Sequence, residues 1–364
     1  MSLTELFDDE LIPVLRRLGD RPKGAGQEPP SAADADAREQ VWAALAELGE
    51  LRPLLPVRLG GPADALSRLV GTAELMGPAL FQSPFQDTVL AAALLAADGR
   101  HDALLDRMAA GTRTIALAVR ERGTDEPSYP LPLATDGGRL SGTRRFVAFA
   151  ADVDLILVAG DREHALVPAR APGVTLRRHD EIGRGDLHRV ILERAEPIRG
   201  GLLPHGSSYA AALARARVVQ AGYLTGMARG ALELAVERVR SRSAFGKPLA
   251  QHQALAHRLA AAAAEATVVN SFVRSVARDA DAGHDIGPTA AQALFLAADL
   301  ARDVTAEAVH LYGAAGLTEE QDISVFHRRA AVDTLRFGSP TALRREVAAL
   351  LAARPHGLGD RRDE

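Results

Sequence analysis

The order in which helical and strand-like periodicities follow one another constrains the fold of this chain more than any single motif. Up to about Gly111, apolar residues recur at helical intervals between Gly, Pro and Asp-Gly breaks. Short β-branched runs such as TIALAVRE, DLILVAG and RVILERA then alternate with turn formers, and four Ala-rich helical stretches follow. The predicted fold is mainly α with a central β domain: a helical domain over residues 1–111, a β domain over 112–204 and a helical bundle over 205–354.

Two segments are predicted to lie outside the packed domains. Residues 21–40, RPKGAGQEPPSAADADAREQ, are rich in Pro, Gly, Ser and Asp and are expected to form a flexible linker. Residues 355–364 are expected to form a disordered tail. In the first bundle helix, Gly222, Gly226 and Gly230 recur every four residues, which predicts close packing of that helix against a neighbour.

The composition excludes several classes of function. A net charge of −4, from 43 basic and 47 acidic residues, shows no excess of basic residues that would indicate nucleic-acid binding. The chain has no cysteine, which excludes disulfides, thiolate nucleophiles and Cys-type zinc sites and fits a cytoplasmic location. The apolar run VLAAALLAA is too short to cross a bilayer, and the histidines lack the paired spacing of a metal site. We therefore expect a globular protein with no membrane span and no metal.

The first break in the bundle, RSRSAFGKPLAQHQALAHRLA, combines residues suited to holding a polar ligand. Phe245 and Gly246 end one helix, so Arg242 lies at its last turn beside an open junction. An Arg there can bind a phosphate with its forked guanidinium, and Gln253 can donate to and accept from a polar ring edge. The alternative is that Arg242 neutralises a helix C-terminus and Gln253 is solvated. The domain order itself predicts a flat cofactor between the β domain and the bundle.

This stretch closely resembles the flavin-binding signature of the acyl-CoA dehydrogenase family, and the resemblance extends through the domain order from about residue 36 to 352. In that family, the residues matching Arg242, Phe245 and Gln253 contact FAD across a subunit interface. The resemblance therefore implies FAD as cofactor, a β-barrel-like middle domain, a C-terminal four-helix bundle and an acyl-CoA or acyl-carrier thioester as substrate. It also implies electron-transfer flavoprotein as electron acceptor, and either a homo-oligomer or a heterotetramer with a related dehydrogenase subunit.

Other positions match the family less well. In VHLYGAAGLTEEQD, His310 stands where a Gln is usual, and Gly313 resembles the start of the family's turn that faces the pyrophosphate or adenosine of FAD. A plain glycine helix cap is the alternative for Gly313. In the β domain, Phe146 matches a Trp that shields the flavin, whereas Ala148 and Arg120 replace hydroxyl residues that bond the flavin ring.

The family's catalytic carboxylate is missing from both positions at which it occurs. Desaturation of an acyl thioester between its α and β carbons requires a carboxylate to remove the α-proton. Most members carry a Glu just before a Gly near the C-terminus, where this chain has Phe337 before Gly338. A smaller branch takes its Glu from the first bundle helix, where this chain has Ala216.

Three interpretations follow. In the first, the chain is a self-sufficient enzyme whose substitute base is Asp333, one helical turn before Phe337. Alternatively, the chain resembles the non-catalytic subunits of heteromeric acyl-CoA dehydrogenases, such as those of bacterial sterol side-chain breakdown, and a partner brings the Glu; this is the interpretation we favour. A flavin-free acyl-binding or assembly protein is the third. Arg217 matches a family Arg near the CoA end of the substrate, with a surface charge as the alternative.

Overall fold

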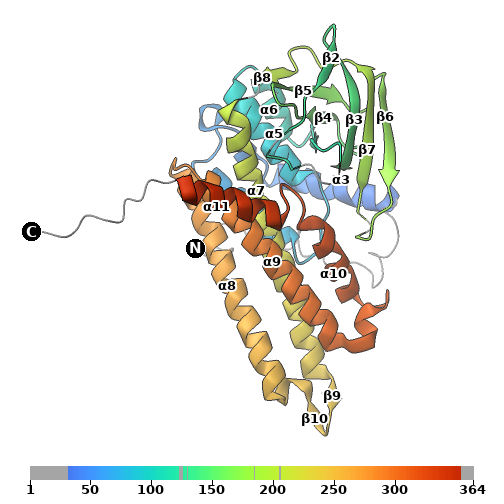
Figure 1. The fold of residues 1–364 in the computed structure, drawn as a ribbon, viewed down its shortest axis with the longest axis vertical. Helices are drawn as coiled ribbons and strands as arrows, with labels where there is room; N and C mark the ends of the chain where they lie inside the picture. The colour runs from blue at the N-terminus through green and yellow to red at the C-terminus, as the bar shows by residue number, and fades with distance from the viewer. Residues whose placement is uncertain (1–31, 123–125, 129, 184, 205, 354–364) are drawn as a thin grey trace, which may run out of the picture.

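The computed structural model describes residues 32–122, 126–128, 130–183, 185–204 and 206–353 (Figure 1). The predicted N-terminal helical segment, residues 21–31 of the predicted linker and the predicted tail at 355–364 lie outside this part of the chain. The first domain is helical. Its elements are α3 (Ala32–Glu47), η1 (Arg52–Leu54), η2 (Val57–Leu59), α4 (Ala65–Met76), α5 (Phe85–Asp98) and α6 (Asp102–Ala109).

The boundary of the predicted linker is wrong at its C-terminal end, because residues 32–40 belong to α3. The prediction gave weight to the Asp content of this segment, whereas its recurring alanines have the highest helix propensity. Trp42 and Leu45 of α3 are buried in the main hydrophobic core. Arg38 forms an ion pair with Asp152 of the β domain. Helix α3 is therefore packed into the core of the helices and is also joined to the β domain by an ion pair.

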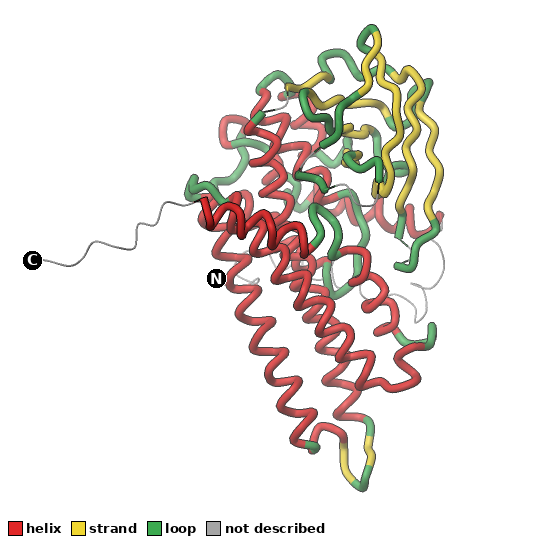
Figure 2. The backbone as a smooth tube through the Cα atoms, in the orientation of Figure 1, coloured by secondary structure: helices red, strands yellow, loops and turns green. Residues whose placement is uncertain are grey.

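The β domain consists of two four-stranded sheets (Figure 2). One sheet has the order β1-β4-β5-β8, in which β1 and β4 are parallel, and the other has the order β2-β3-β7-β6. Ile156 of the first sheet and Val190 of the second contribute to a core that is separate from that of the helices. The strands are β1 (Ile115–Ala118), β2 (Ala134–Asp136), β3 (Arg139–Ala148), β4 (Leu155–Val158), β5 (Glu163–Pro168), β6 (Val174–His179), β7 (Leu187–Ala195) and β8 (Leu202–Pro204).

The C-terminal bundle is built around the long helix α7, which packs against α4, α5, α8 and α9. Helices α7, α8 and α9 run toward a small hairpin at the end of the molecule opposite the β domain; α7 reaches up to the region of β8, and α11 crosses near the upper ends of α8 and α9 (Figure 1). The fourth predicted stretch is two helices, α10 and α11, because Phe337 and Gly338 between them have φ values of 59° and 137°. The elements are α7 (Ser207–Ser241), β9 (Ser243–Ala244), β10 (Lys247–Pro248), η3 (Leu249–Gln251), α8 (Gln253–Asp281), α9 (Gly287–Tyr312), η4 (Gly313–Leu317), α10 (Asp322–Asp333) and α11 (Pro340–Ala353).

Gly222 and Gly226 of α7 lie where this helix crosses α4, and Gly230 packs against Pro78 and Phe326, which confirms the predicted close packing. A Cβ added to Gly226 would lie 2.1 Å from the carbonyl oxygen of Glu74, and one added to Gly222 would lie 2.9 Å from that of Val70. The buried Glu74 side chain accepts hydrogen bonds from Arg274 at 2.8 Å and Arg229 at 3.1 Å. The first domain and the bundle are therefore joined by direct backbone contact and by a buried ionic cluster.

Candidate functional site

A cleft lies where the first domain, the β domain and the turn between α10 and α11 meet. It encloses about 960 Å³, counting the space open to solvent. Phe146 and Ala148 of β3 line one part of it, and Asp333 and Phe337 line another. Arg120 lines it as well, so the cleft brings together five of the positions singled out in the sequence, at the junction where a flat cofactor is predicted.

The turn that carries Phe337 is held in a left-handed conformation by its surroundings. Phe337 is only 4% exposed although its φ is 59°, a region that side chains other than Gly rarely adopt. Its carbonyl oxygen accepts a hydrogen bond from Arg217 Nε at 3.1 Å, and the Arg336 guanidinium lies 5.4 Å from its ring centroid. Ala216, the other position of a family carboxylate, is fully buried in α7 and does not line the cleft. An aromatic wall thus stands at the position of the expected base.

Asp333, the proposed substitute base, is buried rather than exposed, with 1% of its surface accessible. Its carboxylate forms an ion pair with Arg329, accepts from Tyr223 Oη at 3.2 Å and accepts from Gln82 Nε2 at 3.3 Å. Burial and the Asp333 charge raise the pKa of Tyr223 well above its ordinary value, so the hydroxyl remains a donor. The carboxylate of Asp333 is therefore engaged by three donors inside the structure.

Arg329 completes this cluster and ties it to the β domain. It donates from Nη1 to Glu181 at 3.1 Å and from Nη2 to Gln82 at 2.5 Å. Burial disfavours the guanidinium charge, yet Asp333, Tyr223 and Glu181 together raise the pKa of Arg329. Arg329 therefore keeps its charge, and the cluster connects the first domain, the β domain and α10 at the wall of the cleft.

Two further carboxylates line the cleft and were not identified from the sequence. Asp87 accepts from Arg336 at 2.8 Å and from the Leu117 amide at 3.1 Å, and burial raises its pKa despite Arg336. Asp186 faces His188 at 3.7 Å and Arg178 at 3.8 Å, and burial likewise raises its pKa. Asp87 could have been identified from the sequence as a candidate site residue, because it is the lone charged residue in the apolar helix FQDTVLAAALL. Asp186 follows a Gly-rich turn that carries no such signal.

An exposed aromatic ring faces the cleft at Phe146. The side chain is 41% exposed, and its ring stacks on His179 with centroids 5.2 Å apart. Burial, with the nearby charges of Arg189 and Arg145, lowers the pKa of His179 and keeps it neutral at pH 7. Arg120 donates to the Leu335 carbonyl at 2.8 Å, which links the β domain to the α10–α11 turn. Ala148 is buried and offers no hydroxyl, as predicted from its residue type.

The other predicted FAD contacts lie at the opposite end of the bundle, at the hairpin and the end of α9 (Figure 1). Phe245 is 95% exposed with a φ of 53°, and its ring is edge-on to His252 at 6.1 Å. Arg242 and Gln253 are exposed beside it, as are His310 and Gly313 at the end of α9. None of these five lines the cleft. Within one chain, the two groups of predicted cofactor residues are therefore not brought together.

Arg217 has a structural role in this arrangement. Its guanidinium is 4% exposed and donates to Glu346 at 2.8 and 2.9 Å and to Ser128 Oγ at 2.7 Å. With its Nε bonded to the Phe337 carbonyl, every nitrogen of the group has an internal acceptor. The alternative of a surface charge is therefore wrong, because the guanidinium is buried. Contact of Arg217 with a substrate phosphate stays a prediction, although its donors are occupied in this arrangement.

The described ranges contain neither a metal-binding cluster nor a membrane-spanning helix. Among those residues, no group of three or more His, Cys, Asp or Glu side chains could hold a metal ion. No helix in the same part of the chain is long and apolar enough to span a membrane.

Comparison with known proteins gives consistent matches. The family model described as "Acyl-CoA dehydrogenase, C-terminal domain" matches residues 206–352. The acyl-CoA dehydrogenase FadE28 of Mycobacterium tuberculosis is 30% identical over 260 residues, which cover 69% of this chain and 75% of that protein. Butyryl-CoA dehydrogenase from Megasphaera elsdenii has the same fold, with a TM-score of 0.83 at 18% identity over 97% of this chain and 99% of that one. The ChsE4-ChsE5 complex from M. tuberculosis gives a TM-score of 0.80 at 22% identity over 98% and 100%.

Proposed function

Because the chain belongs to the acyl-CoA dehydrogenase family, we propose that it is the base-lacking subunit of a heteromeric, FAD-dependent acyl-CoA dehydrogenase. The family comprises oxidoreductases that act on CH–CH groups. The observation that carries the proposal is the buried Phe337 wall at the cleft, where the family's base is expected. A related partner chain would supply the carboxylate that removes the α-proton.

The residues of the cleft fit a flavin. FAD is the cofactor of this family, and when bound it accepts the hydride that leaves the β-carbon of the acyl thioester. Phe146 presents an exposed aromatic face inside the cleft, which suits stacking of a flat ring. The guanidinium of Arg145 also lines the cleft and has no hydrogen bond or ion pair within the described residues, so it is available to a negative charge on cofactor or substrate.

The carboxylates of the cleft support the absence of a base in this protomer. Asp87 and Asp186 face Arg336 and Arg178, and Asp333 is held by Arg329, Tyr223 and Gln82. A general base must be free to approach the proton that it removes. These ionic clusters instead give the cleft a fixed shape, and Phe337 excludes water from the part where the acyl group would react.

The separation of the two cofactor groups supports an assembly of at least two chains. Arg242, Phe245 and Gln253 project from the end of α7 and the start of α8, and in the proposal they contact FAD that lies in the cleft of a neighbouring subunit. An exposed Phe in a strained left-handed conformation is costly unless a partner covers it. The ChsE4-ChsE5 complex shows that this fold occurs in a two-chain assembly.

The test compares the chain alone with the chain co-expressed with a related protein that carries the family Glu. Alone, the chain is expected to leave the flavin absorbance unchanged when an acyl-CoA is added, and the co-purified pair is expected to bleach it, with electron-transfer flavoprotein restoring the oxidised spectrum. Stoichiometric FAD binding and bleaching by the chain alone would overturn the proposal. If neither preparation shows a flavin band, the flavin-free interpretation holds instead.

A gain-of-function variant sharpens this test. Phe337→Glu places a carboxylate at the family position, and it should give the chain flavin bleaching of its own. Phe337→Gln is the matched control, because it has nearly the same shape and cannot accept the proton. A general base contributes about 10² to 10⁴ in rate, so the Glu variant should exceed the Gln variant by about that factor.

A further inference from the structure

A second cavity lies in the first domain, away from the cleft. It encloses about 800 Å³, counting the space open to solvent, and shares no lining residue with the cleft. The loop between η1 and α4 forms one side of it, with Leu55 and Pro62 among the lining residues. Leu69 of α4 and Val89 of α5 line the interior. Most of its lining is apolar, as in the pockets that hold small amphipathic molecules.

One cation reaches this apolar cavity. Arg215 of α7 lines it and is partly buried. Within the described residues, the guanidinium takes part in no hydrogen bond and in no ion pair within 4 Å, although five N–H donors are available. Burial lowers the pKa of Arg215, and the charge of Asp281 offsets only part of that effect. The protein therefore leaves a charge at this position without the partner that would normally accompany it.

The one carboxylate among the described lining residues is used elsewhere. Asp281, at the C-terminal end of α8, accepts from the Leu66 amide at 2.8 Å, the Ser67 amide at 2.9 Å and Ser67 Oγ at 2.6 Å. These contacts cap the N-terminus of α4, whose own N-cap residue makes no side-chain cap. Since both oxygens of Asp281 are engaged by α4, Arg215 still has its donors available.

We propose that this cavity binds a carboxylate with an apolar chain, whose head group pairs with Arg215 and whose chain lies against Leu55, Leu69 and Val89. A guanidinium and a carboxylate form the strongest common charge-assisted hydrogen bonds, and they do so best where water is partly excluded. The rim loop has prolines at 53, 56 and 62, so the cavity is held open by a stiff backbone. The site is separate from the cleft, and the proposal does not depend on the function proposed above.

The test titrates the full-length protein with octanoate and with octan-1-ol, using calorimetry and thermal melting. Octanoate is expected to bind and to raise the melting temperature, and the alcohol should bind at least about tenfold more weakly, because it lacks the charge. Arg215→Met should weaken octanoate binding by at least about tenfold. Since Asp281 keeps its contacts with α4, this variant is expected to fold normally.

A second variant and a control locate the ligand. Ala93→Leu fills the cavity from α5 and leaves Arg215 in place, and it should weaken octanoate binding as well. Phe146→Ala, in the cleft, should leave octanoate affinity unchanged. The proposal is refuted if the wild type does not bind octanoate, or if Arg215→Met binds it as well as the wild type. It is also refuted if Phe146→Ala is the variant that loses affinity, since the ligand would then occupy the cleft.

Discussion

Arg217→Met is expected to lower the free energy of unfolding by about 3 kcal/mol, because it breaks a buried ion pair and leaves Glu346 without its partner. The Arg217 side chain is 4% exposed and that of Glu346 is 24% exposed. The substitution also removes the donors to Ser128 Oγ at 2.7 Å and to the Phe337 carbonyl at 3.1 Å. The general cost of breaking a buried pair is about 3–5 kcal/mol, and we take the lower value because water reaches Glu346.

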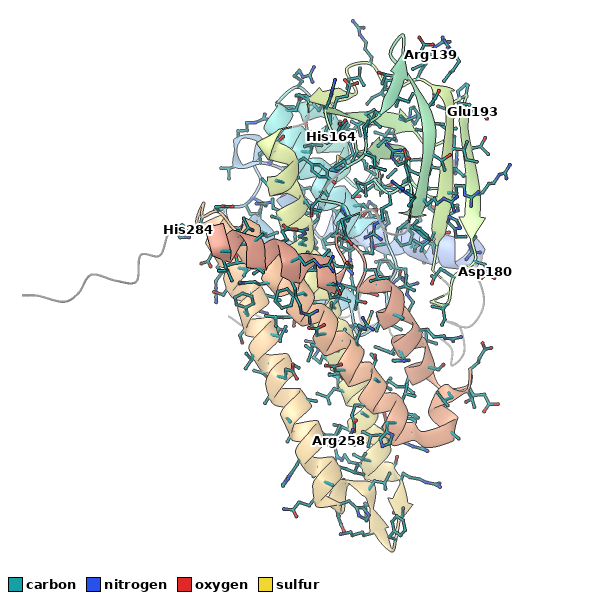
Figure 3. The ribbon with its side chains drawn as sticks, viewed as in Figure 1. Arg139, His164, Asp180, Glu193, Arg258 and His284 are labelled. Atoms are coloured by element: carbon teal, nitrogen blue, oxygen red, sulfur yellow. The ribbon has the colours of Figure 1, made fainter. Side chains whose placement is uncertain are left out.

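The assay is thermal unfolding followed by circular dichroism. At about 2 °C per kcal/mol for a large domain, Arg217→Met should melt about 6 °C below the wild type. The matched control is Arg139→Met, which breaks an ion pair with Glu196 whose two side chains are 45% and 65% exposed; Arg139 lies on β3 at the outer end of the β domain (Figure 3). Since exposed pairs contribute less than about 1 kcal/mol, its melting temperature should change by no more than about 2 °C.

A double variant separates the loss of the pair from the loss of substrate contact. Replacing Arg217 and Glu346 together by Met removes both charges, and it should recover much of the stability lost in the single variant. If Arg217→Met instead melts within about 1 °C of the wild type and raises KM for acyl-CoA, the structural assignment is wrong. Arg217 would then have the role of the matching residue in the family.

Three further predictions concern packing, chemistry and pH. Gly226→Ala should lower the free energy of unfolding, measured by denaturant titration, by about 1–3 kcal/mol, because the added Cβ would lie 2.1 Å from the Glu74 carbonyl oxygen. The control is Gly287→Ala, whose Cβ would meet only Asp285 at 3.4 Å and should not destabilise the protein. Equal effects of the two substitutions would contradict the packing argument. Asp333→Asn should lower stability and leave flavin reduction in the co-purified pair within about threefold of the wild type, whereas a loss of about 10²-fold or more would make Asp333 the base. Burial raises the pKa of Glu346, but the contacts with Arg217 and Ser128 outweigh burial, so the pKa is lowered in the folded protein. The stabilisation by Glu346 is therefore complete above its unfolded pKa of about 4.3. It is lost as pH falls through the lower folded pKa. Unfolding titrations between about pH 6 and 3 should therefore show a steeper acid loss for the wild type than for Glu346→Gln, and parallel curves would contradict the assignment.

Local sequence features determined the type and order of the elements. Period-3.6 and period-2 hydrophobic patterns depend only on residues a few positions apart, so the helical, β and helical regions were predictable. The glycine repeat of α7 was predictable for the same reason, since its spacing places bare backbone on one face. That positions 216 and 337 hold Ala and Phe and no carboxylate is likewise a matter of residue type. The start of α3 was misplaced because composition and helix propensity favour different structures there.

Partners far apart in the sequence were decided by the tertiary structure. The sequence placed Asp333 one helical turn before Phe337, and only the packing of α10 against α7 and the loop after α4 brings Tyr223 and Gln82 to it. Arg217 meets Glu346 across 129 residues, a pairing that no local pattern encodes. Whether a charged side chain binds a ligand or stabilises the fold depends on which opposite charge lies within a few ångströms and how much water is excluded. The residue types follow from the sequence, whereas their ionic partners and burial exist only once the chain has folded.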